Sequence, residues 1–157
     1  MTAWVERSPV AAAYLNPALA ASIICEAAQA YQRDRDPMIW PLAYVVLPFV
    51  LHRPTRNALP SNTRTHLSTW VGREPVLRAG FPYRAISLAP ITSEGLRFGV
   101  RYRMLRLQDG HIHNRINQNT EIDPALTQLL SAARLVGRWL AKSREPSTVF
   151  ALLGVGV

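Results

Sequence analysis

Two histidines placed two residues apart are the side chains whose spacing best suits chemistry. His111 and His113 flank Ile112, and on a strand both rings face the same side. With two further ligands, such a pair can hold a metal ion. No cysteine or carboxylate cluster at ligand spacing accompanies them, and Asp109 is expected to be used by a turn. We therefore expect two solvent-facing histidines, no metal site and no cofactor.

No catalytic set is recognisable elsewhere in the chain. The sequence has neither a glycine-rich phosphate loop nor a nucleophile-elbow motif, and no carboxylate pair is placed for acid–base work. His52 and His66 are isolated from any group that would complete a triad. Cys25 lies in an alanine-rich helical pattern that favours a small, buried apolar role. We expect no catalytic residues, and thus a protein that is not an enzyme.

An arginine cluster is the best candidate for binding an anion. Arg97 and Arg101 are four residues apart and project together from a predicted helix, and Arg103, Arg106 and Arg115 follow them. Beside a hairpin, such residues contact phosphates or enter a groove of DNA. The sequence therefore predicts these five arginines as nucleic-acid-binding residues. A solvated helix face is the alternative interpretation.

An abrupt change from apolar to polar residues marks a second candidate surface. Residues 41–71 read PLAYVVLPFVLHRPTRNALPSNTRTHLSTWV, and the polar part contains Arg56, Thr63 and Arg64 without an acidic residue. A buried element that leads directly into a basic surface suits docking on a partner or binding an anion. We take Arg56, Thr63 and Arg64 as candidate partner-binding residues.

The composition indicates one folded domain over residues 1–157 with unevenly distributed charge. The chain is 48% apolar, which is enough to build a core. Residues 53–115 hold eleven arginines and three acidic residues, a surplus of eight positive charges, whereas the rest carries seven of each sign. Such a field favours nucleic acid or an acidic protein surface.

Neither the start of the chain nor its apolar runs predict a membrane location. The first residues lack the basic and apolar parts of a signal peptide. The apolar run 38–51 contains two prolines and is shorter than the roughly 20 residues that span a bilayer. A single cysteine fits a reducing compartment. We expect a cytoplasmic protein without membrane contact.

The elements that position these residues follow from caps, prolines and periodicity. Asn16 and Asp123, each followed by proline, predict helix starts, and the alanines after Asn16 indicate that another helix approaches closely. Pro90 is expected to stop one helix, with Thr92 or Ser93 beginning the next. The expected helices span roughly residues 16–32, 41–52, 61–73 (capped by Ser61), 76–88, 92–104, 123–142 and 146–154.

A hairpin between helices decides the expected fold class. Asp109-Gly110 between short alternating segments predicts a type I′ turn, with the hairpin over residues 105–113. Several helices followed by a hairpin and another helix are typical of a winged-helix domain. We expect a mainly α fold with a small β-hairpin, organised as a winged-helix-like core with additional N- and C-terminal helices.

Aromatic residues near the basic segment are expected in the core. Trp70, together with Leu67, should pack against the helix that contains Val45 and Phe49. Tyr83 lies among basic residues, but aromatic residues in helical patterns are more often buried than used for stacking on bases.

Four segments together resemble a known bacterial family. They are LNPALAASIICEAAQAY, residues 41–71, AISLAPITSEGLRFGV and STVFALLGV, and their most specific string is L-P-x-x-T-R-x-x-L-x-x-W over residues 59–70. On these residues the chain resembles the small middle component of bacterial three-component ABC systems, conflict systems akin to Lamassu-type anti-phage defence. The resemblance implies a non-enzymatic adaptor, built on a winged-helix core, that joins an SMC- or Rad50-like ABC ATPase to a variable effector subunit. DNA is a further partner that the resemblance implies.

Two functional hypotheses of different classes remain at this point. The first is the adaptor subunit of an anti-phage defence complex. The second is a stand-alone winged-helix DNA-binding transcriptional regulator, which the basic middle of the chain and the pair Arg97 and Arg101 favour. An ABC ATPase encoded next to the chain would support the first hypothesis.

Overall fold

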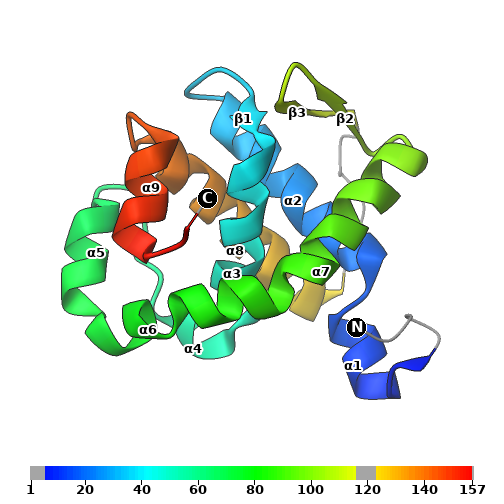
Figure 1. Ribbon diagram of the computed structural model, residues 1–157, viewed down its shortest axis with the longest axis horizontal. Coiled ribbons are helices and arrows are strands. Elements are labelled where there is room, and N and C mark those ends of the chain that lie inside the picture. Colours follow the sequence, from blue (N-terminus) through cyan, green and yellow to red (C-terminus); the bar gives the residue numbers. More distant parts are fainter. Residues whose placement is uncertain (1–5, 116–122, 157) are drawn as a thin grey trace.

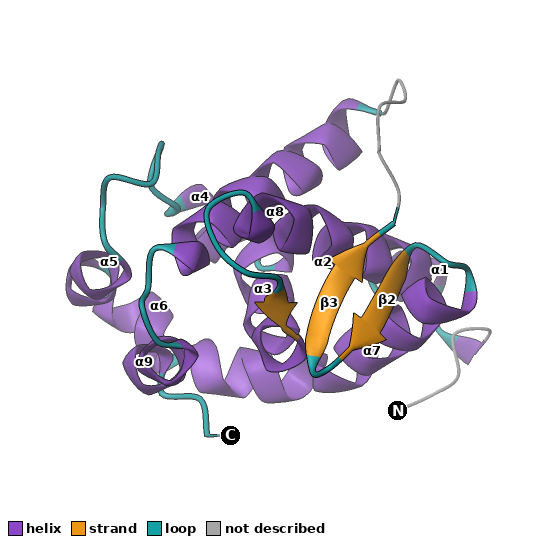
Figure 2. Cartoon of the chain, turned by 90° about the horizontal axis from the view of Figure 1, so that it is seen from above, coloured by secondary structure: helices purple, strands orange, loops and turns teal. Residues whose placement is uncertain are grey.

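Helix α2 (Pro17–Gln32) is the element around which the other long helices pack in this computed structural model. The structure describes residues 6–115 and 123–156. Helices α7 (Phe81–Arg101) and α8 (Pro124–Ala141) both contact α2, which lies between them when the molecule is seen from above (Figure 2). The other elements are α1 (Pro9–Tyr14), β1 (Met38–Ile39), the 3₁₀ helix η2 (Trp40–Leu42), α3 (Ala43–Leu51), α4 (Arg53–Asn57), α5 (Leu67–Arg73), α6 (Pro75–Ala79), β2 (Leu105–Gln108), β3 (His111–Asn114) and α9 (Pro146–Leu153).

Small residues allow these helices to approach α2 closely, as the alanine-rich sequence predicts. A Cβ atom on Gly137 of α8 would lie 2.1 Å from the carbonyl oxygen of Ala27. One on Gly95 of α7 would lie 2.7 Å from the Cβ of Ala20. The stretch Pro9–Gln32 is long and apolar enough to cross a membrane by length and composition alone. Within the fold, however, α2 packs against α7 and α8 as a core helix does.

The predicted caps and the predicted hairpin are confirmed. The side chains of Asn16 and Asp123 accept hydrogen bonds from the first turns of α2 and α8, and Gly154 ends α9 in the left-handed conformation. Asp109 and Gly110 have φ angles of 52° and 78°, as a type I′ turn requires. Strands β2 and β3 pair antiparallel, with Leu107 opposite Ile112.

A short strand that the sequence analysis did not anticipate completes a three-stranded antiparallel sheet. Strand β1 pairs with β3, with Met38 opposite Ile112, so the strand order is β1-β3-β2. Trp40 extends this contact because its backbone N–H donates to the Gly110 carbonyl at 3.0 Å. The sheet lies along one side of the molecule, at the top of Figure 1, and its strand β2 is next to the C-terminal end of α7.

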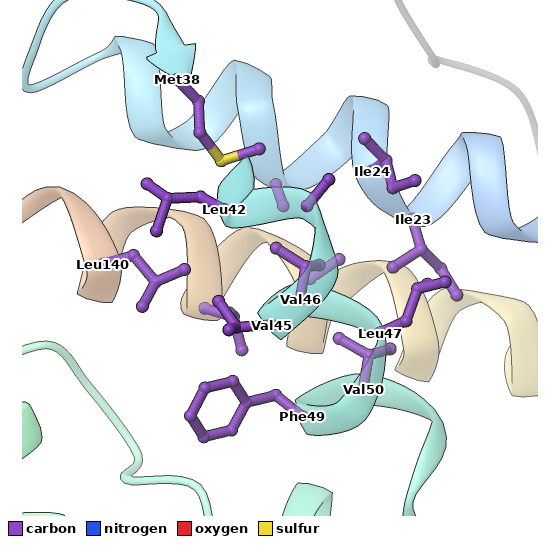
Figure 3. Packing of buried hydrophobic residues seen from close by; sticks show 14 of the residues in the cluster. Ile23, Ile24, Met38, Leu42, Val45, Val46, Leu47, Phe49, Val50 and Leu140 are labelled. Carbon is purple, nitrogen blue, oxygen red and sulfur yellow. The ribbon is translucent and has the colours of Figure 1, made fainter. Parts of the chain in front are cut away.

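The core is built around α3, which is buried along almost its whole length. Every residue from 43 to 50 except Tyr44 is buried. Figure 3 shows α3 lying across α2 and α8, with its side chains directed among theirs. Trp70 and Leu67 are 3% and 4% exposed, and the Trp70 ring lies 5.5 Å from that of Phe49. The expected core position of Trp70 is therefore confirmed.

One predicted helix boundary is wrong, because α7 runs without a break through Pro90. Pro90 is exposed, and so is Ile86, whose carbonyl cannot receive a hydrogen bond from a proline four residues later. Water can satisfy that carbonyl on the solvent face, so the helix continues. Thr92 and Ser93 do not cap a helix; their hydroxyls donate to the carbonyls four residues earlier at 3.0 and 3.1 Å.

A second predicted boundary is also wrong, because the helix expected from Ser61 starts at Leu67 with His66 as its N-cap residue. In the preceding loop, the Asn62 side chain accepts a hydrogen bond from the backbone N–H of Arg64 at 2.9 Å. Such local bonds compete with helix formation. The Thr65 carbonyl, in addition, accepts a hydrogen bond from the indole of Trp139. The loop is thus held by contacts that a helix would break.

Candidate macromolecule-binding surfaces

The five arginines predicted to bind nucleic acid lie at one end of the molecule. Arg97 and Arg101 are exposed in the last two turns of α7, and Arg103, Arg106 and Arg115 are exposed around the base of the hairpin. The base is closed by a hydrogen bond from the Arg115 backbone N–H to the Met104 carbonyl at 3.0 Å. We call these five residues the arginine end.

The charges of the arginine end face solvent. Within residues 6–115 and 123–156, the ion pairs are Arg7 with Glu94 and Arg134 with Glu26, so no member of the arginine end takes part in one. The Arg101 guanidinium lies over the ring of Tyr102, 5.8 Å from its centroid. Exposed guanidinium groups at a helix end are suited to contact phosphates or carboxylates.

The hairpin histidines lie on the face of the sheet that carries Arg106. The register places His113 opposite Arg106 and His111 opposite Gln108, whereas Ile112 faces the core. The Nδ1 atom of His111 is 2.7 Å from the Asp109 carbonyl oxygen. Among the described residues, no group of three or more histidine, cysteine or acidic side chains is arranged to hold a metal ion.

The residues predicted to bind a partner lie on α4 and in the loop after it. Arg56 is half-buried, and its guanidinium donates to the Val50 carbonyl, so this side chain holds the turn between α3 and α4. Thr63 is half-buried and Arg64 is exposed. Of the three, Arg64 is therefore the one most open to a partner.

Large apolar side chains are exposed along the N-terminal half of α7. Tyr83 is 77% exposed and Ile86 is 73% exposed, so the expected core position of Tyr83 is wrong. Phe81, two residues earlier, is fully buried. A helical pattern identifies a face, but only the packing of the whole chain decides which face is covered.

Two apolar hollows flank this part of α7. One, of about 370 Å³, is lined by Trp40, Pro41, Tyr44, Ala85, Ile86, Ala89, Phe150, Val155 and Gly156. The other, of about 320 Å³, is lined by Leu15, Leu51, His52, Tyr83, Arg84, Ser87 and Leu88. We call Tyr83, Ile86 and the first hollow the apolar face. Exposed apolar patches beside hollows mark sites where macromolecules bind.

A second arginine group was not predicted, because its members are far apart in the sequence. A polar hollow of about 210 Å³ lies between α2 and α8. It is lined by Arg33, the C-cap residue of α2, and by Arg134 and Arg138 of α8. Arg134 is oriented by Glu26, whose carboxylate oxygen lies 2.5 Å from its Nε. Arg138 also lines an adjoining hollow that reaches Arg56.

The family of the chain follows from comparison with known proteins. A family model described as the ABC-three component (ABC-3C) system Middle Component 3 matches residues 4–157. The chain belongs to this family. The match confirms the resemblance on which the adaptor hypothesis depends, and it covers both the arginine end and the apolar face. Comparison with the curated proteins and with the solved structures finds no match.

Membership of the family identifies partners in general terms. As a middle component of a three-component ABC system, the protein works together with ABC ATPase components. The surfaces described above are therefore parts of a protein that functions in an assembly.

Two titratable groups of this middle component, Cys25 and His52, have structural roles. Burial, with a smaller effect of the Glu26 charge, raises the pKa of the Cys25 thiol to about 12. The thiol is therefore neutral and unreactive near neutral pH. Burial, followed by the charges of Arg84 and Arg56, lowers the pKa of His52. The Nδ1 of His52 lies 2.7 Å from the Thr55 hydroxyl and accepts the Thr55 backbone N–H at the start of α4.

Proposed function

We propose that this middle component is a non-enzymatic adaptor that links an SMC- or Rad50-like ABC ATPase to the effector subunit of an anti-phage defence complex, akin to Lamassu-type systems. The proposal places the protein in the cytoplasm and gives it neither a cofactor nor a catalytic residue. Family membership supports the partnership with the ATPase component. The outer surface of α7 and the separate hollow lined by Arg33, Arg134 and Arg138 are two distinct surfaces, which supports the link between two partners.

The apolar face is the observation that carries the adaptor proposal. Tyr83 and Ile86 each expose about three quarters of their surface, and they line neighbouring apolar hollows of about 320 and 370 Å³, respectively. Burying such side chains against a partner contributes about 25 cal/mol for each Å² removed from water. Isolated exposed apolar residues need no explanation, but a group of them around a hollow is typical of an interface.

Co-expression tests the adaptor proposal directly. The chain is produced with the ATPase and the effector of its own system, and a tag on the chain is used for purification followed by size-exclusion chromatography. We expect one complex that contains all three proteins. If the ATPase and the effector form the same complex without this chain, the linking role is wrong. Turnover of nucleotide or cleavage of nucleic acid by the purified chain alone would contradict the non-enzymatic role.

DNA contact through the arginine end is a second candidate activity, in the complex or as a stand-alone winged-helix regulator. We propose a winged-helix core built from α2, β1, α3, α7, β2 and β3, with α4 to α6 inserted between its last two helices. The order of these elements and the central position of β3 in the sheet support the proposal. In such a core, α7 takes the place of the DNA-reading helix. The arginine end supplies positive charge beside the hairpin.

The salt dependence of DNA affinity tests this second activity. Replacing Arg97 and Arg101 with glutamine should lower the affinity for all sequences about equally and flatten the plot of log K against log [salt] by roughly one unit for each lost phosphate contact. Replacing Arg33 and Arg138 with glutamine removes the same charge from the other arginine group and serves as the control. An equal loss in both variants would mean that net charge, and not the arginine end, determines the affinity.

A further inference from the structure

The outer surface of α7 combines two chemistries along a single helical line. Tyr83, Ile86 and Pro90 are exposed in its first half, and Arg97 and Arg101 are exposed in its second half. The spacings of three, four, seven and four residues place all five side chains on one face of the helix. Tyr83 and Arg101 are separated by about 27 Å at 1.5 Å of rise per residue. A ligand that follows α7 therefore meets apolar side chains first and two positive charges afterwards.

We propose that this line is the binding site for an amphipathic helix of the ABC ATPase component, with apolar residues at one end and acidic residues at the other. The inference rests on the proposed adaptor function and identifies the surface and the partner chemistry for it. A helix of about five turns would cover the distance from Tyr83 to Arg101. Its apolar side chains would enter the hollow beside Ile86, and its carboxylates would lie against Arg97 and Arg101.

The shape of the hollow suits a helix. Ala85 and Ala89, one helical turn apart on α7, form part of its wall, and such small side chains leave room for a neighbouring backbone to approach. Trp40 from η2 and Phe150 from α9 supply the opposite wall. Trp40 is 44% exposed, so its ring is also available for contact. A volume of about 370 Å³ has room for a large apolar side chain, which is how helices anchor in grooves.

The charge at the other end of the line is open for an acidic partner. The acidic residue within the line, Glu94, is already neutralised by Arg7, whose Nη2 lies 2.9 Å from its Oε1. Arg97 and Arg101 are not in the ion pairs that the described residues make with one another. Carboxylates of a partner helix would pair with these guanidinium groups in the bidentate manner that arginine favours.

The same arrangement argues against other occupants. If a second copy of the chain docked through this face around a two-fold axis perpendicular to α7, Arg97 and Arg101 of each copy would lie over Tyr83 and Ile86 of the other. An axis parallel to α7 would instead place the arginines of the two copies against each other. In the first arrangement the Tyr83 ring can stack with one guanidinium, but the charge over Ile86 and the hollow would be buried without a carboxylate partner. Nucleic acid alone would satisfy the arginines but would leave the apolar half uncovered, because phosphates take polar and charged partners. A helix with separate apolar and acidic ends satisfies both halves.

Substitutions at exposed positions test the inference without disturbing the core. Ile86→Arg should weaken binding of the purified ATPase component at least tenfold, because a charge would block the apolar hollow. Val10→Arg is the matched control, since Val10 is 70% exposed on α1 and the change adds the same charge elsewhere. We expect the control to bind like the wild type, and circular dichroism should show equal helix content in all three proteins.

Charge reversal tests the second half of the line. Replacing Arg97 and Arg101 with glutamate should also weaken ATPase binding at least tenfold. Exchanging the acidic residues of the partner helix for lysine should restore binding to this variant and not to wild type. Ile86→Arg should leave DNA affinity at least as high as that of the wild type. Because Arg97 and Arg101 could contact either ligand, loss of ATPase binding without loss of DNA binding would identify the protein partner.

Each remaining outcome decides against the inference in a distinct way. Wild-type affinity of Ile86→Arg for the ATPase would overturn the proposed site while leaving the adaptor function intact. Loss of the effector alone would assign the face to the effector. A wild-type dimer that Ile86→Arg converts to a monomer, with ATPase binding retained, would assign it to a second copy. If the wild-type chain does not bind the ATPase at all, the adaptor function itself fails.

Discussion

At the scale of single residues, Trp70 shows how one side chain joins packing to hydrogen bonding. It is 3% exposed, its ring lies 5.5 Å from Phe49 and 5.8 Å from Trp139, and its indole N–H donates to the Ala58 carbonyl at 2.9 Å. The ring contacts hold α5 against the core formed by α3 and α8, and the hydrogen bond holds the C-terminal end of α4 in place.

We expect Trp70→Ala to lower the free energy of unfolding by about 3–5 kcal/mol, because it leaves a cavity among aromatic rings and an unpaired carbonyl. Urea denaturation followed by circular dichroism measures the effect. Trp40→Ala is the control, since Trp40 is 44% exposed and should cost much less. A loss below about 1 kcal/mol for Trp70→Ala would show that the side chain is not a core residue.

A second residue, His52, makes stability depend on pH. Its Nδ1 accepts the hydrogen bond that caps α4, and burial together with Arg84 and Arg56 lowers its pKa below 6.5 in the folded state. Below about pH 6.5 the unfolded chain binds a proton on this residue more readily than the folded chain does. The stabilising contribution of the neutral ring is therefore complete above pH 6.5 and is lost as the pH falls.

Exchange of His52 for asparagine tests this dependence, because asparagine caps a helix without titrating. Melting temperatures measured between pH 5 and pH 8 should fall towards low pH in the wild type and fall less in His52→Asn. The two proteins should have similar melting temperatures at pH 8, where the ring is neutral in both states. Parallel curves over the whole range would show that other groups cause the pH dependence.

Residue types and spacing were sufficient to predict some of the candidate site and not the rest. The exposure of Arg97, Arg101 and Arg106 could be predicted, because charged side chains rarely lose their hydration. The exposure of Tyr83 could not, because the local pattern does not tell which helix face another segment covers. The group of Arg33, Arg134 and Arg138 is formed by the packing of two distant helices, for which the sequence has no local signal.

At the scale of elements, the packing of α8 on α2 depends on the absence of one methyl group. A Cβ on Gly137 would lie 2.1 Å from the carbonyl oxygen of Ala27, and this oxygen belongs to a helix backbone that cannot move aside. Gly72 in α5 is the opposite case, because nothing lies within 4 Å of its added Cβ.

We expect Gly137→Ala to lower the free energy of unfolding by at least about 1–3 kcal/mol, because the added methyl group overpacks the contact between α8 and α2. Gly72→Ala should instead stabilise it by about 0.5–1 kcal/mol, because alanine favours the helix. The urea midpoints of the two variants, compared with that of the wild type, measure both effects. Equal midpoints for both variants would mean that α2 and α8 are not packed as closely as described.

The elements themselves could be predicted where a local cap or turn specifies them, as at Asn16, Asp123 and Asp109-Gly110. Strand β1 has two residues and exists only through its pairing with β3, so no local pattern reveals it. The unbroken course of α7 through Pro90 depends on the exposure of that residue, which again is decided by the packing of other helices.

At the scale of the whole molecule, one hydrophobic cluster connects the elements that carry the two surfaces. Its buried members come from α2, β1, η2, α3, α5, α7, β2, β3, α8 and α9. The apolar face and the arginine end are therefore attached to the same core, and a partner bound at one of them is held in a fixed position relative to the other.

We expect this core to unfold in a single cooperative transition over the domain, as most single domains of up to about 150 residues do. In a variant with Trp4→Phe and Trp40→Phe, the tryptophan fluorescence comes from Trp70 and Trp139 alone, which are buried residues of α5 and α8, respectively. Far-UV circular dichroism reports on all helices together. The two signals should give the same urea midpoint, because the cluster links both tryptophans to the long helices. If the fluorescence changed at a lower urea concentration than the circular dichroism, the segment around α4 to α6 would be a separate unit.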